Sequence, residues 1–167
     1  MSSKIQLWAG SPDYLQWPRT QIMPFSEKRV QFLVRLSEAL LSGHYSAALT
    51  ALGFWLRESQ LRQWQQEYAN DDKVILAPVG RVFIVSPSNV EGLFAYSWAL
   101  SYLMGNQTVV RVSAQLTEDQ QTLFALLTEL DEQMNGLPEQ AFISYAWPNW
   151  QVWGDDAKAQ CQALQSR

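Results

Sequence analysis

Apolar residues recur at helical spacing through most of the first seventy positions of the chain, after an irregular start. Residues 1–25 contain three prolines between large aromatic residues, which indicates an irregular arm lying on an apolar surface. A helix is predicted to begin after Ser26, a residue type that favours the N-cap, and to end at Gly43. Two further stripes of apolar residues predict two more helical segments before the polar run 70–72. The first part of the chain is therefore predicted to be helical.

The pattern changes after residue 72 to short β-branched runs separated by helical stretches. The predicted strands are 74–77, 81–85, 108–112 and 141–145. Helices are predicted between them, one over 90–104 that is apolar nearly all round and one after a capping-box sequence that begins at Thr117. Crossovers of this length imply parallel strands. A further strand-to-helix turn is predicted at 152–156, with a helix running on to residue 167.

This order of elements is typical of a doubly wound α/β unit. We expect a helical N-terminal region with its arm over residues 1–72 and a partial nucleotide-binding α/β domain over 73–167. The two are expected to form one continuous structural unit.

Composition and charge narrow the class of protein. Of the 167 residues, 47% are hydrophobic and 17% are charged, which favours a globular domain. The net charge is −4 and no basic stripe is present, so we expect no nucleic-acid partner. The uncharged stretch 92–110 is interrupted by polar residues, and its apolar core is too short to span a bilayer. With one histidine and one cysteine we expect no metal site. The single cysteine excludes a disulfide framework and favours a cytoplasmic protein.

Three loops that follow predicted strands carry the candidate chemistry, because ligands gather at the carboxyl ends of strands in open α/β sheets. Asn89, at the start of a buried helix, can donate its amide to a developing oxyanion, or it can simply cap the helix. Arg111 can bind a phosphate or ribose hydroxyls, or it can reach solvent or pair with Glu118. Gly154 can let a pyrophosphate approach a helix N-terminus, whereas Asp155 argues against a directly bound phosphate and is also a plausible N-cap.

Other motifs give little support to a specific chemistry. The sequence contains neither a GxGxxG fingerprint nor a P-loop. Cys161 is the only thiol, and the only histidine, His44, belongs to a different helical segment, so Cys161 is interpreted as a structural cysteine. The aromatic residues at 147–153 are interpreted as a cap over the sheet, with stacking on sugars or bases as the alternative.

Three blocks of sequence resemble the acyl-CoA reductase family. The blocks are 77–89, 94–98 and 105–113, and they occur in the family's order and spacing. This family is the bacterial luminescence-type fatty acid reductase component, within the aldehyde dehydrogenase superfamily. With weaker similarities upstream and at 153–155, the resemblance covers most of residues 24–160. It implies an incomplete Rossmann-like parallel sheet of the aldehyde dehydrogenase type.

The resemblance also implies a reaction and a set of site residues. Members reduce a fatty acyl-CoA thioester to an aldehyde through an acyl-cysteine intermediate. Residues 87–89 resemble the superfamily's Pro-x-Asn turn, which implies that Asn89 belongs to the oxyanion hole. Ala114 stands where many NAD-using relatives carry a ribose-binding Glu, and Arg111 stands where related enzymes carry a Lys, so NADPH is the implied cofactor. The implied cofactor-binding residues are Ser86, Pro87, Arg111, Ser113, Gly154 and Asp155.

One departure from the family qualifies this prediction. The family's catalytic cysteine is expected in a domain beyond residue 167, and Cys161 aligns with a helix on the cofactor side. We therefore expect the N-terminal portion of an enzyme, inactive alone, that meets fatty acyl-CoA only with a completing catalytic domain. Truncation, one half of a split enzyme and a repurposed remnant remain open. The alternatives are a non-catalytic interaction module that pairs with a partner chain or self-associates, and a carbohydrate- or lipid-binding protein that uses 147–153.

Overall fold

The computed structural model describes residues 5–18, 22–69, 75–86 and 92–145 of the chain. The helices are α1 (Glu27–Ser42), α2 (Ala47–Trp55), α3 (Glu58–Ala69), α4 (Leu93–Leu103) and α5 (Glu118–Met134). The strands are β1 (Gln6–Gly10), β2 (Arg81–Val85), β3 (Gln107–Arg111) and β4 (Gln140–Ser144). A helical region followed by a partial Rossmann-like sheet with crossover helices confirms the predicted fold class.

The four strands form one mixed sheet in the order β1-β4-β3-β2. The pairs β2–β3 and β3–β4 are parallel, as the crossover helices require, while β1 pairs with β4 antiparallel. The prediction of parallel strands is therefore right for β2, β3 and β4, but the sheet as a whole is not parallel.

The strand β1 corrects the prediction of an irregular arm over the first residues. Its Trp8 donates the indole N–H to Ser144 Oγ on β4 at 2.9 Å, 136 positions away in the sequence. Such a pairing depends on tertiary contacts, so the local pattern of five residues does not reveal it. Residues 11–18 remain irregular and cover an apolar surface, since Trp17 packs on Ala141 and Ile143.

The predicted strand 74–77 is also wrong for residues 75–77, and Val74 lies outside the described residues. Ile75 is 93% exposed, and Pro78 has no N–H to give to a sheet. The backbone N–H groups of Val79 and Gly80 donate to the side chain of Asn106 instead of a neighbouring strand, at 2.8 and 3.2 Å. The strand begins only at Arg81 as a result.

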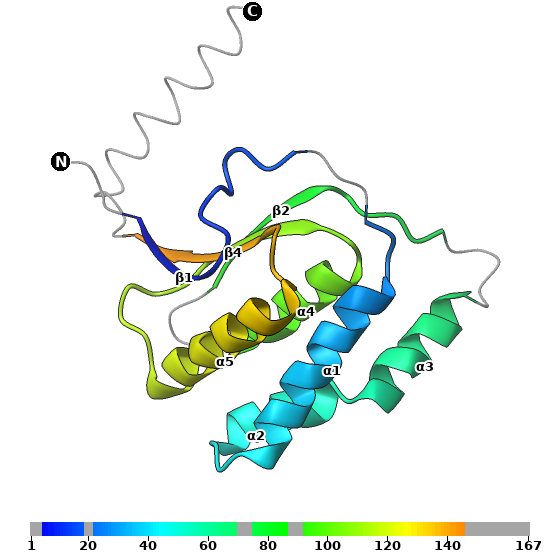
Figure 1. Ribbon diagram of the computed structural model, residues 1–167, viewed down its shortest axis with the longest axis horizontal. Helices are drawn as coiled ribbons and strands as arrows, with labels where there is room; N and C mark the ends of the chain where they lie inside the picture. The colour runs from blue at the N-terminus through cyan, green and yellow to red at the C-terminus, as the bar shows by residue number, and fades with distance from the viewer. Residues whose placement is uncertain (1–4, 19–21, 70–74, 87–91, 146–167) are drawn as a thin grey trace, which may run out of the picture.

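Helices cover one face of the sheet in layers (Figure 1). α4 and α5 pack against the strands, and α1 lies on α4 and α5. α2 packs on α1 and also contacts α5, and α3 packs beside α1. One continuous core joins the helical region to the sheet; its largest fully buried side chains include Trp98, Tyr102, Phe32, Phe94 and Phe142. Within the four described ranges, no helix is long and apolar enough to cross a membrane.

The helix ends follow the predicted signals with one difference. Thr117 forms the predicted capping box with Gln120, each side chain bonded to the other's backbone N–H. Gly105 follows α4 with φ of +86°, and a Cβ there would lie 2.0 Å from the Ile22 carbonyl oxygen, so glycine is required. Ser26 occupies the N-cap of α1, but its side chain makes no capping hydrogen bond.

Candidate functional site

The carboxyl ends of the parallel strands meet at one edge of the sheet, as predicted. Ser86 follows β2 and donates its N–H to the Arg111 carbonyl at the end of β3, at 2.9 Å. Val112 donates in turn to the carbonyl of Ile143 on β4, at 2.8 Å. We call Ser86, Arg111 and Ser113 the carboxyl rim. Of the predicted site residues, Pro87, Asn89, Gly154 and Asp155 lie outside the described residues.

The guanidinium of Arg111 lies over an aromatic ring. Its central carbon is 5.6 Å from the ring centroid of Tyr145, which follows β4. Alternation along β3 places Arg111 on the face away from α5, because Val110 and Val112 are fully buried in the core on the helix side. A cation over an aromatic face gains about 0.5–1 kcal/mol at an exposed site. The Tyr145 ring therefore orients this strand-end arginine at the rim.

The loop between β3 and α5 is held by short local hydrogen bonds. Ser113 Oγ accepts the N–H of Gln115 at 3.2 Å, and the capping box then starts α5. The first turn of α5 carries Glu118 and Asp119, which complement the positive end of its dipole. Their negative charges disfavour an anion at this helix N-terminus, so a phosphate fits better near Arg111.

An open hollow of about 770 Å³ adjoins this loop, on the helix side of the sheet. Its lining comes from β1, the loop and the outer side of α5: Trp8, Ala114, Gln115, Leu116, Gln121, Phe124, Ala125, Thr128, Glu129 and Glu132. Two of these residues are carboxylates on α5, so the hollow favours an uncharged part of a ligand over a phosphate. Trp8 was missed by sequence reasoning because the pairing of β1 with β4 brings it here.

The clearest pKa shifts lie away from the rim. Burial lowers the pKa of Arg29 on α1, and interactions with Tyr102 and Glu139 oppose that shift. Burial raises the pKa of Tyr102 on α4. On the surface, hydrogen bonds from Arg62 and Gln31 lower the pKa of Glu27 to about 2. These groups link helices to one another and to the start of β3 rather than forming part of the rim.

Comparison with protein families shows which family the chain belongs to. The family described as Acyl-CoA reductase (LuxC) matches residues 6–148. The chain belongs to the acyl-CoA reductase (LuxC) family. No curated protein and no solved structure matches it. The predicted resemblance is confirmed, and the match extends upstream of it to include β1.

The groups at the rim of this acyl-CoA reductase family member bear on whether a pyridine nucleotide fits there. Arg111 offers a positive charge and the half-buried Ser113 offers a hydroxyl beside it, whereas Ser86 is 3% exposed and donates its N–H to the Arg111 carbonyl. Ala114 is exposed beside the hollow and adds no negative charge there. A charged phosphate near Arg111 is compatible with these groups, while the hollow lies on the helix-covered side of the sheet.

Proposed function

We propose that the carboxyl rim binds NADPH, and that this chain is the nucleotide-binding portion of an NADPH-dependent fatty acyl-CoA reductase that forms an aldehyde. The observation that carries the proposal is the junction of β2 and β3, where Ser86 is hydrogen bonded to Arg111 in a chain of this family. NADPH would supply the hydride for the reduction.

Each predicted residue has a role in this proposal. Arg111 contacts the 2′-phosphate of the adenosine ribose, and the uncharged Ala114 avoids repelling it. Ser86 and Ser113 contact the nucleotide at the strand ends. Asn89 donates its side-chain amide to the oxyanion that develops on the thioester carbonyl.

The remaining predicted residues complete the nucleotide site. Pro87 contacts the cofactor after β2, and Gly154 and Asp155 contact it at the strand-to-helix turn predicted at 152–156. The thiol nucleophile of the reaction is not assigned to Cys161, which belongs to a predicted helix on the cofactor side. We propose that this chain binds and orients the nucleotide, and that another thiol forms the acyl-enzyme.

Calorimetric titration of the purified chain with NADPH and NADH tests the role of Arg111. Arg111→Ala should weaken NADPH binding by about tenfold or more, because a hydrogen bond to a charged group contributes about 1.5–3 kcal/mol. NADH lacks the 2′-phosphate and should lose much less affinity. Arg81→Ala, at the amino end of β2, is the matched control and should leave both affinities near wild type. Equal losses for the two cofactors would refute the contact with the 2′-phosphate.

A second candidate function is favoured by the outer edge of β2. In the described sheet β2 is an edge strand, and Phe83 and Val85 on it are 55% and 48% exposed. An edge strand with exposed apolar side chains can accept a strand from another polypeptide. Light scattering over a concentration series tests this module function, and a monomer at every concentration would count against self-association.

A further inference from the structure

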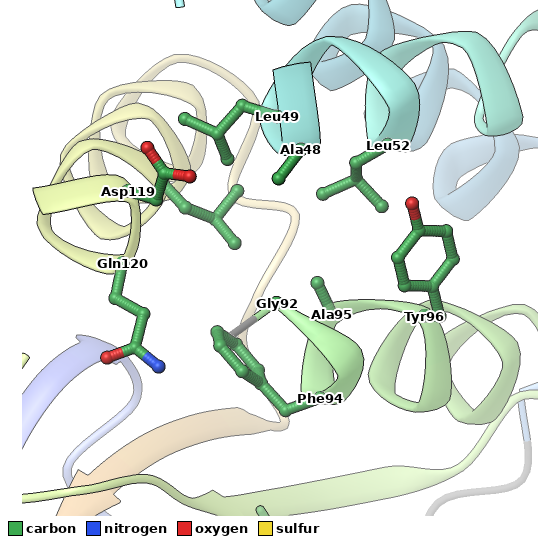
Figure 2. A pocket seen from close by; sticks show the side chains of 10 residues that line it. Ala48, Leu49, Leu52, Gly92, Phe94, Ala95, Tyr96, Asp119 and Gln120 are labelled. Carbon is green, nitrogen blue, oxygen red and sulfur yellow. The ribbon is translucent and has the colours of Figure 1, made fainter. Parts of the chain in front are cut away.

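A second cavity lies between three helices, away from the hollow at the rim. Its volume is about 130 Å³, and it is lined by Ala48, Leu49, Leu52, Gly92, Phe94, Ala95, Tyr96, Asp119, Gln120 and Leu123. Figure 2 shows α2 on one side with Leu49 and Leu52 directed inward, and α4 on the other with Ala95 between Gly92 and Tyr96. We call this the three-helix pocket.

The walls of the three-helix pocket are mostly apolar, and several of them are fixed in place. Leu52, Ala95 and Leu123 are at most 3% exposed. Ser46 donates its hydroxyl to Asp119 Oδ2 at 2.6 Å and so joins the start of α2 to the start of α5 beside the pocket. Tyr96 packs edge-on against Trp55 with ring centroids 4.9 Å apart, which fixes the wall on the α4 side. A preformed apolar cavity of this kind is suited to a hydrocarbon ligand.

The pocket also lies near the carboxyl rim along the chain. α4 and α5 begin after the carboxyl ends of β2 and β3, and the first turns of both helices contribute to the lining. Ser86 precedes Gly92 by six residues, which span at most about 20 Å when fully extended. A long acyl chain whose thioester lies at the rim can therefore reach the pocket.

We propose that the three-helix pocket binds the alkyl chain of the fatty acyl group, an inference that rests on the proposed function. The size fits, because a cavity of about 150 Å³ holds benzene, so this one accommodates about six carbon atoms. The charge fits too, since Asp119 is the charged group in the lining and disfavours a carboxylate or a phosphate inside. The pocket thus selects hydrocarbon over the charged part of a coenzyme A thioester.

Acyl thioesters of N-acetylcysteamine with butanoyl, hexanoyl, octanoyl and decanoyl chains test the proposal on the purified chain. Each methylene that enters the pocket should improve the dissociation constant about fourfold, and the gain should stop once the pocket is full. Methyl NMR gives the location without any substitution. Shifts should concentrate at Ala48, Leu49, Leu52, Ala95 and Leu123. An affinity independent of chain length, or shifts centred on the exposed Val79 and Val85, would overturn the proposal.

Ala48→Phe places a ring in the pocket, while Ala51→Phe makes the same change on the same helix outside the lining. Both alanines are exposed, so the two variants should fold alike. Ala48→Phe should weaken decanoyl thioester binding about tenfold or more and abolish the dependence on chain length, whereas Ala51→Phe should match wild type. Equal binding by the two variants would contradict the proposal.

NADPH titration of the same two variants separates this inference from the proposed function. If the pocket is wrong but the rim is right, the variants and wild type bind NADPH equally and none discriminates between acyl chains. If the rim is wrong, NADPH fails to bind even to wild type, while dependence on chain length still reports on the pocket.

Discussion

The two ends of the parallel strands differ in the burial and hydrogen bonding of their polar side chains. At the amino ends, Arg29, Asn106 and Gln140 are at most 6% exposed. The side chains of Arg29 and Gln140 both donate to the Asn106 carbonyl. At the carboxyl ends, Arg111 and Ser113 are half-buried, and the residues that follow Ser113 line an open hollow. The amino end is thus built as a closed polar network and the carboxyl end as an accessible rim. The difference separates the buried polar network from the proposed nucleotide site along the strands.

The amino-end network centres on the turn between α4 and β3. The Asn106 carbonyl accepts from Arg29 at 3.0 Å and from Gln140 Nε2 at 2.9 Å. Trp98 on α4 donates its indole N–H to Gln140 Oε1 at 3.0 Å. The same network therefore joins α1, α4, β3 and β4, and each polar group in it depends on its neighbours.

Removing Arg29 should have the largest effect on stability. Its guanidinium is buried, donates to the Tyr102 carbonyl at 2.5 Å and lies 3.8 Å from the carboxylate of Glu139. Arg29→Met leaves the Tyr102 carbonyl and the Glu139 carboxylate buried without the positive charge of Arg29. We therefore expect a loss of about 3–5 kcal/mol in the free energy of unfolding. Urea unfolding followed by circular dichroism measures it.

Arg35→Met is the matched control for that substitution, on the same helix. Arg35 forms an exposed ion pair with Glu38, so its loss should change the free energy of unfolding by about 0.5 kcal/mol or less. If the two variants unfold at the same urea concentration, the amino end is not the stabilising network described above.

Asn106→Ala should have the next largest effect. It removes the acceptor of two part-buried hydrogen bonds from the N–H groups of Val79 and Gly80, and each such bond contributes about 0.5–1.5 kcal/mol. Ser113→Ala is the counterpart at the rim, since it removes the acceptor for the N–H of Gln115 in an exposed loop. We expect that rim variant to cost about 0.5 kcal/mol or less. Equal losses would erase the distinction between the two strand ends.

Local sequence patterns were sufficient to predict several helices and strands. The helix starting after Thr117 was predicted from its capping box, and β2, β3 and β4 were predicted from short runs rich in apolar residues. The meeting of Ser86, Arg111 and Ser113 followed from the rule that parallel strands share one carboxyl edge. The roles of those residues in binding stay predictions.

Features that depend on distant segments were not predictable in this way. β1 is defined by its pairing with β4, and Trp8 reaches the hollow only through that pairing. Arg29 sits in an amphipathic helix like any surface arginine, and its burial depends on carbonyls of Tyr102 and Asn106 more than seventy positions away. The three-helix pocket likewise needs α2, α4 and α5 together.

Tyr102 offers the smallest and most specific test of the amino end. Its hydroxyl donates to the Gly136 carbonyl at 2.6 Å, and burial raises its pKa above the ordinary value of about 10. Above that pH the unfolded chain loses the tyrosine proton while the folded chain keeps it, so the free energy of unfolding should fall as pH rises.

Tyr102→Phe should lower the free energy of unfolding by about 1 kcal/mol at neutral pH, and the alkaline decline of that free energy should be shallower than in wild type. Urea unfolding on both sides of this pH measures the two slopes, with Tyr68→Phe at an exposed ring as the control that should follow wild type. Parallel declines for Tyr102→Phe and wild type would mean that the buried hydroxyl does not couple folding to the proton, and that the amino end is more open to solvent than its hydrogen bonds indicate.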